Sequence, residues 1–198
     1  MMSINLVKGQ KIDLTKGTAG LTKLVVGLGW DPAEAKGWFG SKKKNANIDC
    51  DASALLLDAN GKLTKNGNLV CFHNLTSACR SVQHSGDNLT GGGDGDDEQI
   101  TIELSKVPSD VEKILVVVNI YQAEQRNQDF GMIKSAFIRI VNSANNQELV
   151  KFNLTDSYAG MTALITGEIY RHNGEWKFQA IGEGAHAAHI SILAARYQ

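Results

Sequence analysis

The 198-residue sequence lacks the features that mark several common classes of protein. Its three cysteines, Cys50, Cys71 and Cys79, are odd in number and form no Cys-x-x-Cys pair, which argues against a disulfide framework or a zinc knuckle. The longest apolar stretches, such as residues 114–118, are far too short to span a bilayer. The N-terminus has no apolar segment of the kind found in secretory signals. We therefore expect a cytoplasmic protein.

An excess of positive charge is also missing, since the formal net charge is −1. Proteins that bind nucleic acids generally present a basic face, so we expect no nucleic-acid partner. The one basic run is Lys42, Lys43 and Lys44. We interpret this run as a solvated loop, and a contact with phosphate or anionic lipid is the alternative interpretation.

The composition that remains is that of an ordinary globular domain. Apolar residues make up 42% and charged residues 21% of the chain, close to the average for folded proteins. A chain of this length buries a full core without disulfides or structural zinc. Neither an internal repeat nor a long linker divides it. We therefore expect one domain over residues 1–198.

Short strands separated by turn residues dominate the chain. Apolar residues alternate with polar ones over residues 100–104, which predicts a half-buried strand. A continuous β-branched run over residues 114–121 predicts a central strand buried on both faces. Two pairs of segments predict hairpins: 137–141 with 149–154, and 164–171 with 176–181 around Asn173-Gly174. Further strands are predicted at residues 24–28, 52–57 and 69–73.

Helical patterns are scarce. Residues 185–197 predict a C-terminal helix, and residues 109–113 predict a short helical turn after Pro108. Residues 32–46 are interpreted as an irregular surface loop. The sequence thus predicts an all-β, mainly antiparallel β-sandwich with a short C-terminal helix and a few minor helical turns.

Residues 85–98 carry the chemistry that stands out most. This acidic segment holds five carboxylates, five glycines and no lysine or arginine. Calcium takes about 6–8 oxygen ligands from carboxylates, carbonyls and amides, and a glycine-rich acidic segment supplies all three. Two like charges about 4 Å apart repel by about 4 kcal/mol at an effective dielectric of 20, so such crowding favours a bound cation. The carboxylates are Asp87, Asp94, Asp96, Asp97 and Glu98.

A second acidic element lies at residues 49–53. Because residues two apart in a strand share a face, Asp49, Asp51 and Ser53 are predicted on one side, with Cys50 on the other. Asp31, which follows a glycine-containing turn, is a further candidate oxygen donor. Asn127 and Asp129 rank lower.

Seven short motifs, in one order and spread over nearly the whole chain, resemble a known family. The resemblance is to the TerD tellurium-resistance family, and it implies a β-sandwich that binds two calcium ions and acts in resistance to tellurite and other stresses. Two positions depart from the family pattern: Cys50 stands where leucine is usual, and Asp129 where asparagine is common. The motifs are Leu6-Val7-Lys8-Gly9-Gln10, Gly27-Leu28-Gly29-Trp30-Asp31, Asp49-Cys50-Asp51-Ala52-Ser53, Ser85-Gly86-Asp87-Asn88-Leu89-Thr90-Gly91, Gly95-Asp96-Asp97-Glu98, Ala136-Phe137-Ile138-Arg139 and Tyr170-Arg171-His172-Asn173-Gly174-Glu175-Trp176.

We accordingly expect a calcium-binding interaction module that is not an enzyme. Its partners would be other proteins of the same stress-response system, through which it would associate peripherally with a membrane. We expect calcium to raise thermal stability, mainly through Asp49, Asp51, Asp87, Asp96 and Asp97. The predicted metal ligands are Asp31, Asp49, Asp51, Asp87, Asn88, Thr90, Gly91, Asp94, Asp96, Asp97 and Glu98.

Two alternatives come from other classes of function. The same carboxylates with magnesium or manganese would suit a phosphohydrolase or nuclease, which requires open coordination positions and a basic residue to meet phosphate. A thiol-based reductant of tellurite would use Cys50, Cys71 or Cys79. Cys50 and Cys71 are expected to be buried in strands and slow to react, and Cys79, in a polar stretch, is the best candidate for a reactive thiol.

Overall fold

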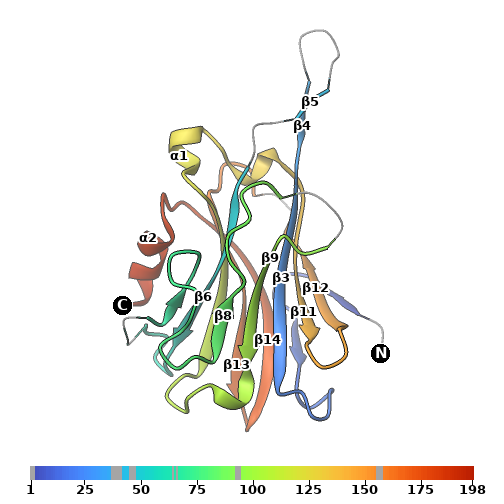
Figure 1. The fold of residues 1–198 in the computed structure, drawn as a ribbon, viewed down its shortest axis with the longest axis vertical. Coiled ribbons are helices and arrows are strands. Elements are labelled where there is room, and N and C mark those ends of the chain that lie inside the picture. Colours follow the sequence, from blue (N-terminus) through green and yellow to red (C-terminus); the bar gives the residue numbers. More distant parts are fainter. Residues whose placement is uncertain are drawn as a thin grey trace.

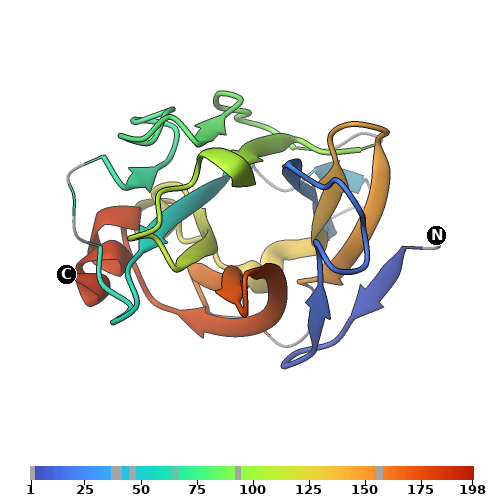
Figure 2. The same cartoon turned by 90° about the horizontal axis from the view of Figure 1, so that it is seen from below.

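The structure is a computed structural model that describes residues 3–36, 42–44, 48–63, 65, 67–91, 95–154 and 158–198. Its strands form two six-stranded sheets that face each other, as Figure 2 shows in the view along the strands. The predicted antiparallel β-sandwich is therefore confirmed. Within the described residues, no helix is long and apolar enough to cross a membrane.

The first sheet has the order β1-β12-β11-β3-β9-β8 (Figure 1). The short edge strand β1 pairs in parallel with β12, and the other neighbours pair antiparallel. The bounds are β1 Ile4–Leu6, β3 Lys23–Pro32, β8 Val82–His84, β9 Glu98–Glu103, β11 Ile133–Asn142 and β12 Gln147–Asn153.

The second sheet has the order β2-β14-β13-β10-β6-β7, with antiparallel pairing throughout. A separate two-stranded ribbon, β4 Glu34–Lys36 with β5 Lys42–Lys44, projects beyond both sheets in Figure 1. The bounds of the second sheet are β2 Lys11–Asp13, β6 Cys50–Leu57, β7 Leu69–Val70, β10 Lys113–Ile120, β13 Ala163–His172 and β14 Glu175–Ala185.

The central strand β10 is buried on both faces, as its β-branched run predicted. Ile114, Val116 and Val118 belong to the core between the two sheets. Leu115 and Val117 face the other way, into a second apolar cluster that includes Leu193 of α2 (Ile190–Ala194). The small C-terminal helix therefore covers the outer face of the second sheet. Because both faces of β10 are covered, its sequence is apolar throughout and does not alternate between apolar and polar residues.

Both predicted hairpins are present. The strand β13 pairs with β14 across Asn173 and Gly174, whose φ angles are 54° and 78°. Two consecutive positive φ values are those of a type I′ turn, which matches the twist of the two strands. The strands β11 and β12 form the other hairpin.

Four local predictions need correction. The C-terminal helix begins at Ile190 and continues as the 3-10 helix Ala195–Tyr197, because Ala185 still pairs with Ala163 in the sheet. Residues 109–113 form no helix, but Val111 N donates to the Pro108 carbonyl at 3.1 Å and closes a single turn. The Arg171 guanidinium donates to the carbonyls of Val107, Pro108 and Val111 around this turn.

The segment 32–46 is not simply an irregular loop, since Pro32 ends β3 and the β4-β5 ribbon lies within it. Similarly, the strand predicted at 69–73 stops at Val70, because Cys71 and Asn74 hydrogen-bond across a tight turn. The remaining short helices are η1 Leu104–Lys106, α1 Ala123–Arg126 and η2 Phe130–Met132.

Candidate metal centre

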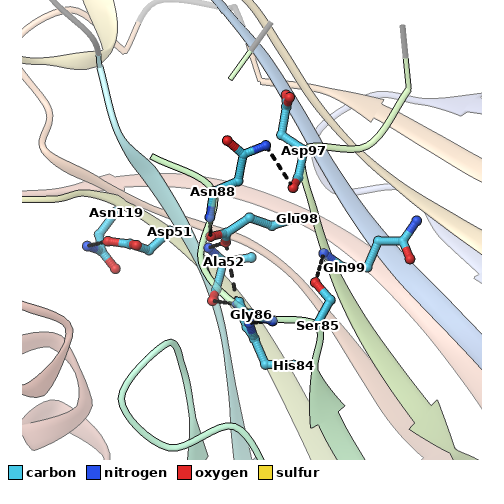
Figure 3. Close-up of polar contacts among 10 residues, drawn as sticks. All are labelled: Asp51, Ala52, His84, Ser85, Gly86, Asn88, Asp97, Glu98, Gln99 and Asn119. Carbon is cyan, nitrogen blue, oxygen red and sulfur yellow. Dashed lines mark hydrogen bonds and ion pairs between the residues drawn. The ribbon is translucent and has the colours of Figure 1, made fainter. Parts of the chain in front are cut away.

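The second acidic element, residues 49–53, lies at the start of β6. As predicted, Cys50 and Ala52 point into the core between the sheets. Asp51 is opposite Asn119 of β10 in the strand register, and the Asn119 amide nitrogen Nδ2 donates to Asp51 Oδ2 at 3.1 Å (Figure 3). Pairing with β10 therefore fixes the Asp51 side chain on the outer face of the second sheet.

Three carboxylates meet at this end of the molecule. Asp49, Asp51 and Asp87 each offer an oxygen atom, and these atoms lie within 4.8 Å of one another. We call these three residues the aspartate cluster. Asp49 and Asp51 are only 3% and 1% exposed, whereas Asp87 is exposed. Asp49 Oδ1 is buried without a hydrogen-bond partner among the described residues. A cation placed between the three would satisfy this oxygen.

The electrostatics of the aspartate cluster are unfavourable without a cation. Burial first, and then the charge of Asp87, raise the pKa of Asp49 to about 6, although Arg126 opposes the shift. Burial, followed by the charges of Glu98, Asp49 and Asp87, raises the pKa of Asp51 to about 8. A divalent cation would hold both groups ionised by replacing the missing counter-charge.

Glu98 joins the two acidic elements without belonging to the aspartate cluster. Its fully buried carboxylate accepts the backbone N–H of Ala52 at 2.7 Å and that of Asn88 at 3.2 Å (Figure 3). His84 Nε2 lies 3.4 Å from Glu98 Oε2, and His84 Nδ1 accepts from Gly86 N. Glu98 thus anchors the acidic segment to β6 and brings Asp87 beside Asp49 and Asp51.

The backbone at Gly91 lies so close to the Trp30 indole that only glycine fits there. Its φ angle is +55°, and a Cβ there would overlap the Trp30 indole. The indole N–H of Trp30 donates to the carbonyl of Ile48 at 2.8 Å. The acidic segment is therefore packed against the residues that lead into Asp49, which positions it over the start of β6.

Asp96 has a different environment from the one its sequence context predicts. The Arg139 guanidinium on β11 binds its carboxylate through Nε at 2.6 Å and Nη2 at 3.1 Å. The Asp96 side chain is 2% exposed and lies over the backbone of Gly27, where any Cβ would overlap it. This carboxylate is already neutralised, so the expectation that it carries calcium-dependent stability does not fit the geometry.

The other predicted ligands are engaged separately. Asp97 Oδ2 accepts the backbone N–H of Trp30 at 2.9 Å, and Asp31 accepts a hydrogen bond from Ser135 at 2.7 Å. Asn88 Oδ1 accepts from the backbone N–H of Thr90. Asp94 lies outside the described residues. Among the lower-ranking candidates, Asp129 caps η2 through Gly131 N, and Asn127 ends α1 with a φ of 51°.

Sequence reasoning missed two residues of the centre. Arg126 of α1 lies 4.0 Å from Asp49 Oδ2 and stacks on the Tyr121 ring at 5.1 Å. Asn119 holds Asp51 from the neighbouring strand. Both are distant in sequence from the acidic elements. Asn119 is a polar residue at the end of an apolar strand, which was the one pattern that indicated a site there.

The cysteines agree with the burial expected for them. Cys50 and Cys71 are buried, and Cys79 is partly exposed. Burial, followed by the charges of Asp51 and Asp49, raises the pKa of the Cys50 thiol well above its usual value. Burial alone would raise the pKa of Cys79, but hydrogen bonds with Ser77 and Ser81 outweigh it and lower the pKa.

Comparisons with known proteins show to which family the chain belongs. "Stress response protein SCP2" of Bacillus subtilis (strain 168) is 57% identical over 99% of this chain and 100% of that protein. "Tellurium resistance protein TerD" of Serratia marcescens is 44% identical over 99% and 97% of the two chains. A crystal structure of a homologue of telluride resistance protein (TerD) from Streptomyces coelicolor A3(2) superposes with a TM-score of 0.68. It covers 90% of this chain and 99% of that one at 22% identity, which supports the fold alone. The TerD domain family model matches residues 2–197, and the chain therefore belongs to the TerD family.

Proposed function

We propose that this protein is a calcium-binding stress-response protein associated with tellurite resistance, and that it acts as an interaction module rather than as an enzyme. The observation that carries the proposal is the aspartate cluster, in which two buried carboxylates and a third, exposed one share a small volume. The names of the relatives, which refer to stress response and tellurium resistance, support the cellular role.

The donor set favours calcium over softer metals. All three groups are carboxylates, and hard oxygen ligands suit calcium and magnesium. Cys50 points into the core, and His84 contacts Glu98, which lies outside the aspartate cluster. Magnesium requires near-ideal octahedral geometry, whereas calcium accepts an irregular shell that mixes carboxylates with carbonyls. The acidic segment is rich in glycine and brings the exposed Asp87 beside Asp49 and Asp51, which suits the irregular shell.

The ligands are assigned as follows. Asp49, Asp51 and Asp87 would hold one ion. A second ion, which the family resemblance implies, would draw on other oxygens of the acidic segment, and Asp96 is left out because Arg139 binds it. Calcium would thus fix the acidic segment over β6 and shape a surface for other proteins of the same stress-response system. Association with a membrane would be peripheral and would go through those partners.

The position of Arg126 favours one alternative function, that of a phosphohydrolase or nuclease. A phosphohydrolase or nuclease needs a cation beside its metal, and Arg126, which is 37% exposed, lies next to Asp49. Hydrolysis of bis(p-nitrophenyl) phosphate with manganese or magnesium tests this activity. Turnover that disappears in both Asp51→Asn and Arg126→Gln would establish the enzyme; its absence with every divalent metal supports the module.

Calorimetric titration with calcium, with magnesium as competitor, tests the main proposal. We expect heat of binding in the wild type and its loss in Asp51→Asn. Asp110→Asn is a matched control, because Asp110 is exposed and pairs with Lys65 away from the cluster. Tellurite tolerance of cells that carry either variant tests the cellular role. Equal binding by the wild type and Asp51→Asn would overturn the proposal.

A further inference from the structure

The aspartate cluster and the β4-β5 ribbon lie at the same end of the sandwich. The strand β3 ends at Pro32 just before the ribbon, and β6 begins at Cys50 shortly after it. Figure 1 shows the ribbon projecting at the same end as α1. The acidic segment reaches this end as well, because Asp87 belongs to the aspartate cluster. We call residues 34–36, 42–44, 49–51 and 85–91 the cluster end.

The ribbon is strongly basic. Its six paired residues include four lysines and one glutamate, a formal charge of +3, whereas the whole chain carries −1. Lys36 and Lys42 are direct partners in the register and form the outermost pair. Like charges opposite each other destabilise a strand pair, so this pair favours an anionic partner. The placement therefore supports contact of the lysine run with an anionic surface over a solvated loop.

The projection also separates these lysines from the acidic groups of the sandwich. A strand of three residues spans about 10 Å. Interactions between exposed charges are largely screened beyond about 8 Å at physiological salt. The outer part of the ribbon therefore presents positive charge although the chain as a whole is slightly acidic.

Leu89 is an exposed apolar residue within the acidic segment, with 59% of its surface accessible. The preceding residue is held firmly, because Asn88 N donates to Glu98 Oε1 and Asn88 Nδ2 donates to the Asp97 carbonyl, both at 3.2 Å. On the other side, Thr90 N donates to Asn88 Oδ1 at 3.2 Å. The backbone around Leu89 is thus fixed, and its side chain is presented to the outside beside the aspartate cluster.

The aspartate cluster is open on the side of Asp87. Asp49 and Asp51 are buried and Asp87 is exposed, so a cation held by the three would be reached from outside. Asp49 Oδ1, which is buried and unpartnered among the described residues, favours such a cation. Calcium takes about 6–8 oxygen ligands, more than three carboxylates supply at one oxygen each. Phosphate oxygens of a surface that approaches this end would suit the remaining positions.

We propose that, with calcium in the aspartate cluster, the cluster end docks directly on an anionic lipid surface. This inference rests on the calcium site of the proposed function, and it adds a contact of the chain's own to any made through partners. The lysines of the ribbon would meet lipid phosphates, and Leu89 would enter the boundary between headgroups and acyl chains. A nucleic acid offers phosphate without an apolar layer and leaves the exposed leucine unexplained.

Sedimentation of the full-length protein with lipid vesicles tests the proposal. We expect binding in calcium to phosphatidylcholine vesicles that contain phosphatidylglycerol. Binding should be at least about tenfold weaker in chelator, and equally weak to pure phosphatidylcholine. Millimolar glycerol 3-phosphate, which carries the phosphate without the acyl chains, should not release the protein. Release by this compound would assign the site to free phosphate and overturn the proposal.

A matched pair of variants tests the role of Leu89. Leu89→Ser should bind the phosphatidylglycerol vesicles about tenfold more weakly, since it removes one leucine from the apolar layer. Val7→Ser is the control, because Val7 is 63% exposed but lies outside the cluster end. Its segment contacts the middle of β14, where Gly9 N donates to the Ala180 carbonyl. Val7→Ser should bind like wild type.

A second pair tests the ribbon at constant total charge. Lys36→Glu/Lys42→Glu reverses the outermost pair and should weaken vesicle binding at least about tenfold. Lys8→Glu/Lys16→Glu makes the same change in net charge at exposed lysines on either side of β2, outside the cluster end. This control should stay within about threefold of wild type. Equal binding by the two double variants would overturn the proposal.

Calorimetric titration with calcium separates this inference from the proposed function. Wild type, Leu89→Ser and Lys36→Glu/Lys42→Glu should all bind calcium, which also confirms that the variants are folded. Calcium binding without vesicle binding would overturn this inference and leave the proposed function standing. Absence of calcium binding in the wild type would overturn both. Vesicle binding that is equal in calcium and in chelator would overturn the calcium-dependent docking alone.

Discussion

Asp51 and Asp96 belong to similar acidic elements, but the fold gives them opposite surroundings. Asp51 is 1% exposed and has two further carboxylates beside it. The Asp96 side chain is 2% exposed and is bound by both Nε and Nη2 of Arg139. The two side chains are therefore equally buried, but only Asp96 has a positively charged partner. A carboxylate-rich sequence thus indicates the region of a candidate metal site. Whether a given carboxylate needs a metal depends on the partner that it contacts in the fold.

The largest expected effect comes from removing the partner of Asp96. Arg139→Met should destabilise the protein by about 2–4 kcal/mol, because it leaves a buried charge uncompensated. The loss should be the same in calcium and in chelator. Urea denaturation measures it. Lys134→Met, at an exposed position near the start of the same strand, is the control and should change stability by less than about 0.5 kcal/mol.

If Arg139→Met lost stability in calcium but not in chelator, Asp96 would belong to a metal site. Asp96→Asn on the Arg139→Met background sharpens the result, because it removes the stranded charge. We expect this double variant to recover part of the lost stability.

The opposite behaviour is expected for Asp51→Asn. In chelator it should be neutral or stabilising by about 1 kcal/mol, since it removes repulsion within the aspartate cluster. A ligand at a hundredfold excess over its dissociation constant stabilises by about 2.7 kcal/mol, or several degrees in a domain of this size. Wild type should show this calcium-dependent shift and Asp51→Asn should lose it. Thermal melts in calcium and in chelator give both numbers. If the wild type melts at the same temperature in calcium and in chelator, the proposal is contradicted.

The pH dependence offers a third test of the comparison. A carboxyl whose pKa is raised on folding binds its proton more tightly in the folded state, so stability falls as pH rises from the unfolded value to the folded one. For Asp51, this window runs from the ordinary aspartate range to about 8. In chelator, the free energy of unfolding should fall by about 2 kcal/mol between pH 6 and pH 8. Asp51→Asn should flatten the slope, and a stability that rises over this range would refute the assignment.

The smallest expected effect is on thiol reactivity. Cys50 is the first residue of β6 and lies between Asp49 and Asp51 in sequence, whereas Cys79 is partly exposed and lies outside β6. Calcium should slow the reaction of Cys50 with a disulfide reagent severalfold, by suppressing local opening of β6. Cys79 should react fastest and be unaffected by calcium. Mass spectrometry of labelled peptides separates the sites, and rapid labelling of Cys50 in calcium would argue against a cation-stabilised strand.

Local pattern was sufficient for the longer strands and for part of the candidate centre, but not for short strands such as β1, β2 and β8 or for the β4-β5 ribbon. The alternation Asp49-Cys50-Asp51-Ala52 predicted which side chains share a face, because the side-chain period of a strand is two. The Asn173-Gly174 pair predicted a hairpin, because its φ angles fit the turn. The β-branched run of residues 114–121 predicted a strand buried twice, and α2 provides the second cover.

Tertiary structure decided the rest, because the deciding contacts join residues far apart in the chain. Asn119 reaches Asp51 across 68 positions, and Arg139 reaches Asp96 across 43. Neither pairing leaves a periodic trace in the sequence, since strand order and register are set by packing of the whole sandwich. The sequence by itself therefore determined that carboxylates would be concentrated in two places. Only the fold assigned an arginine to Asp96 and brought Asp87 to the strand face that Asp49 and Asp51 share.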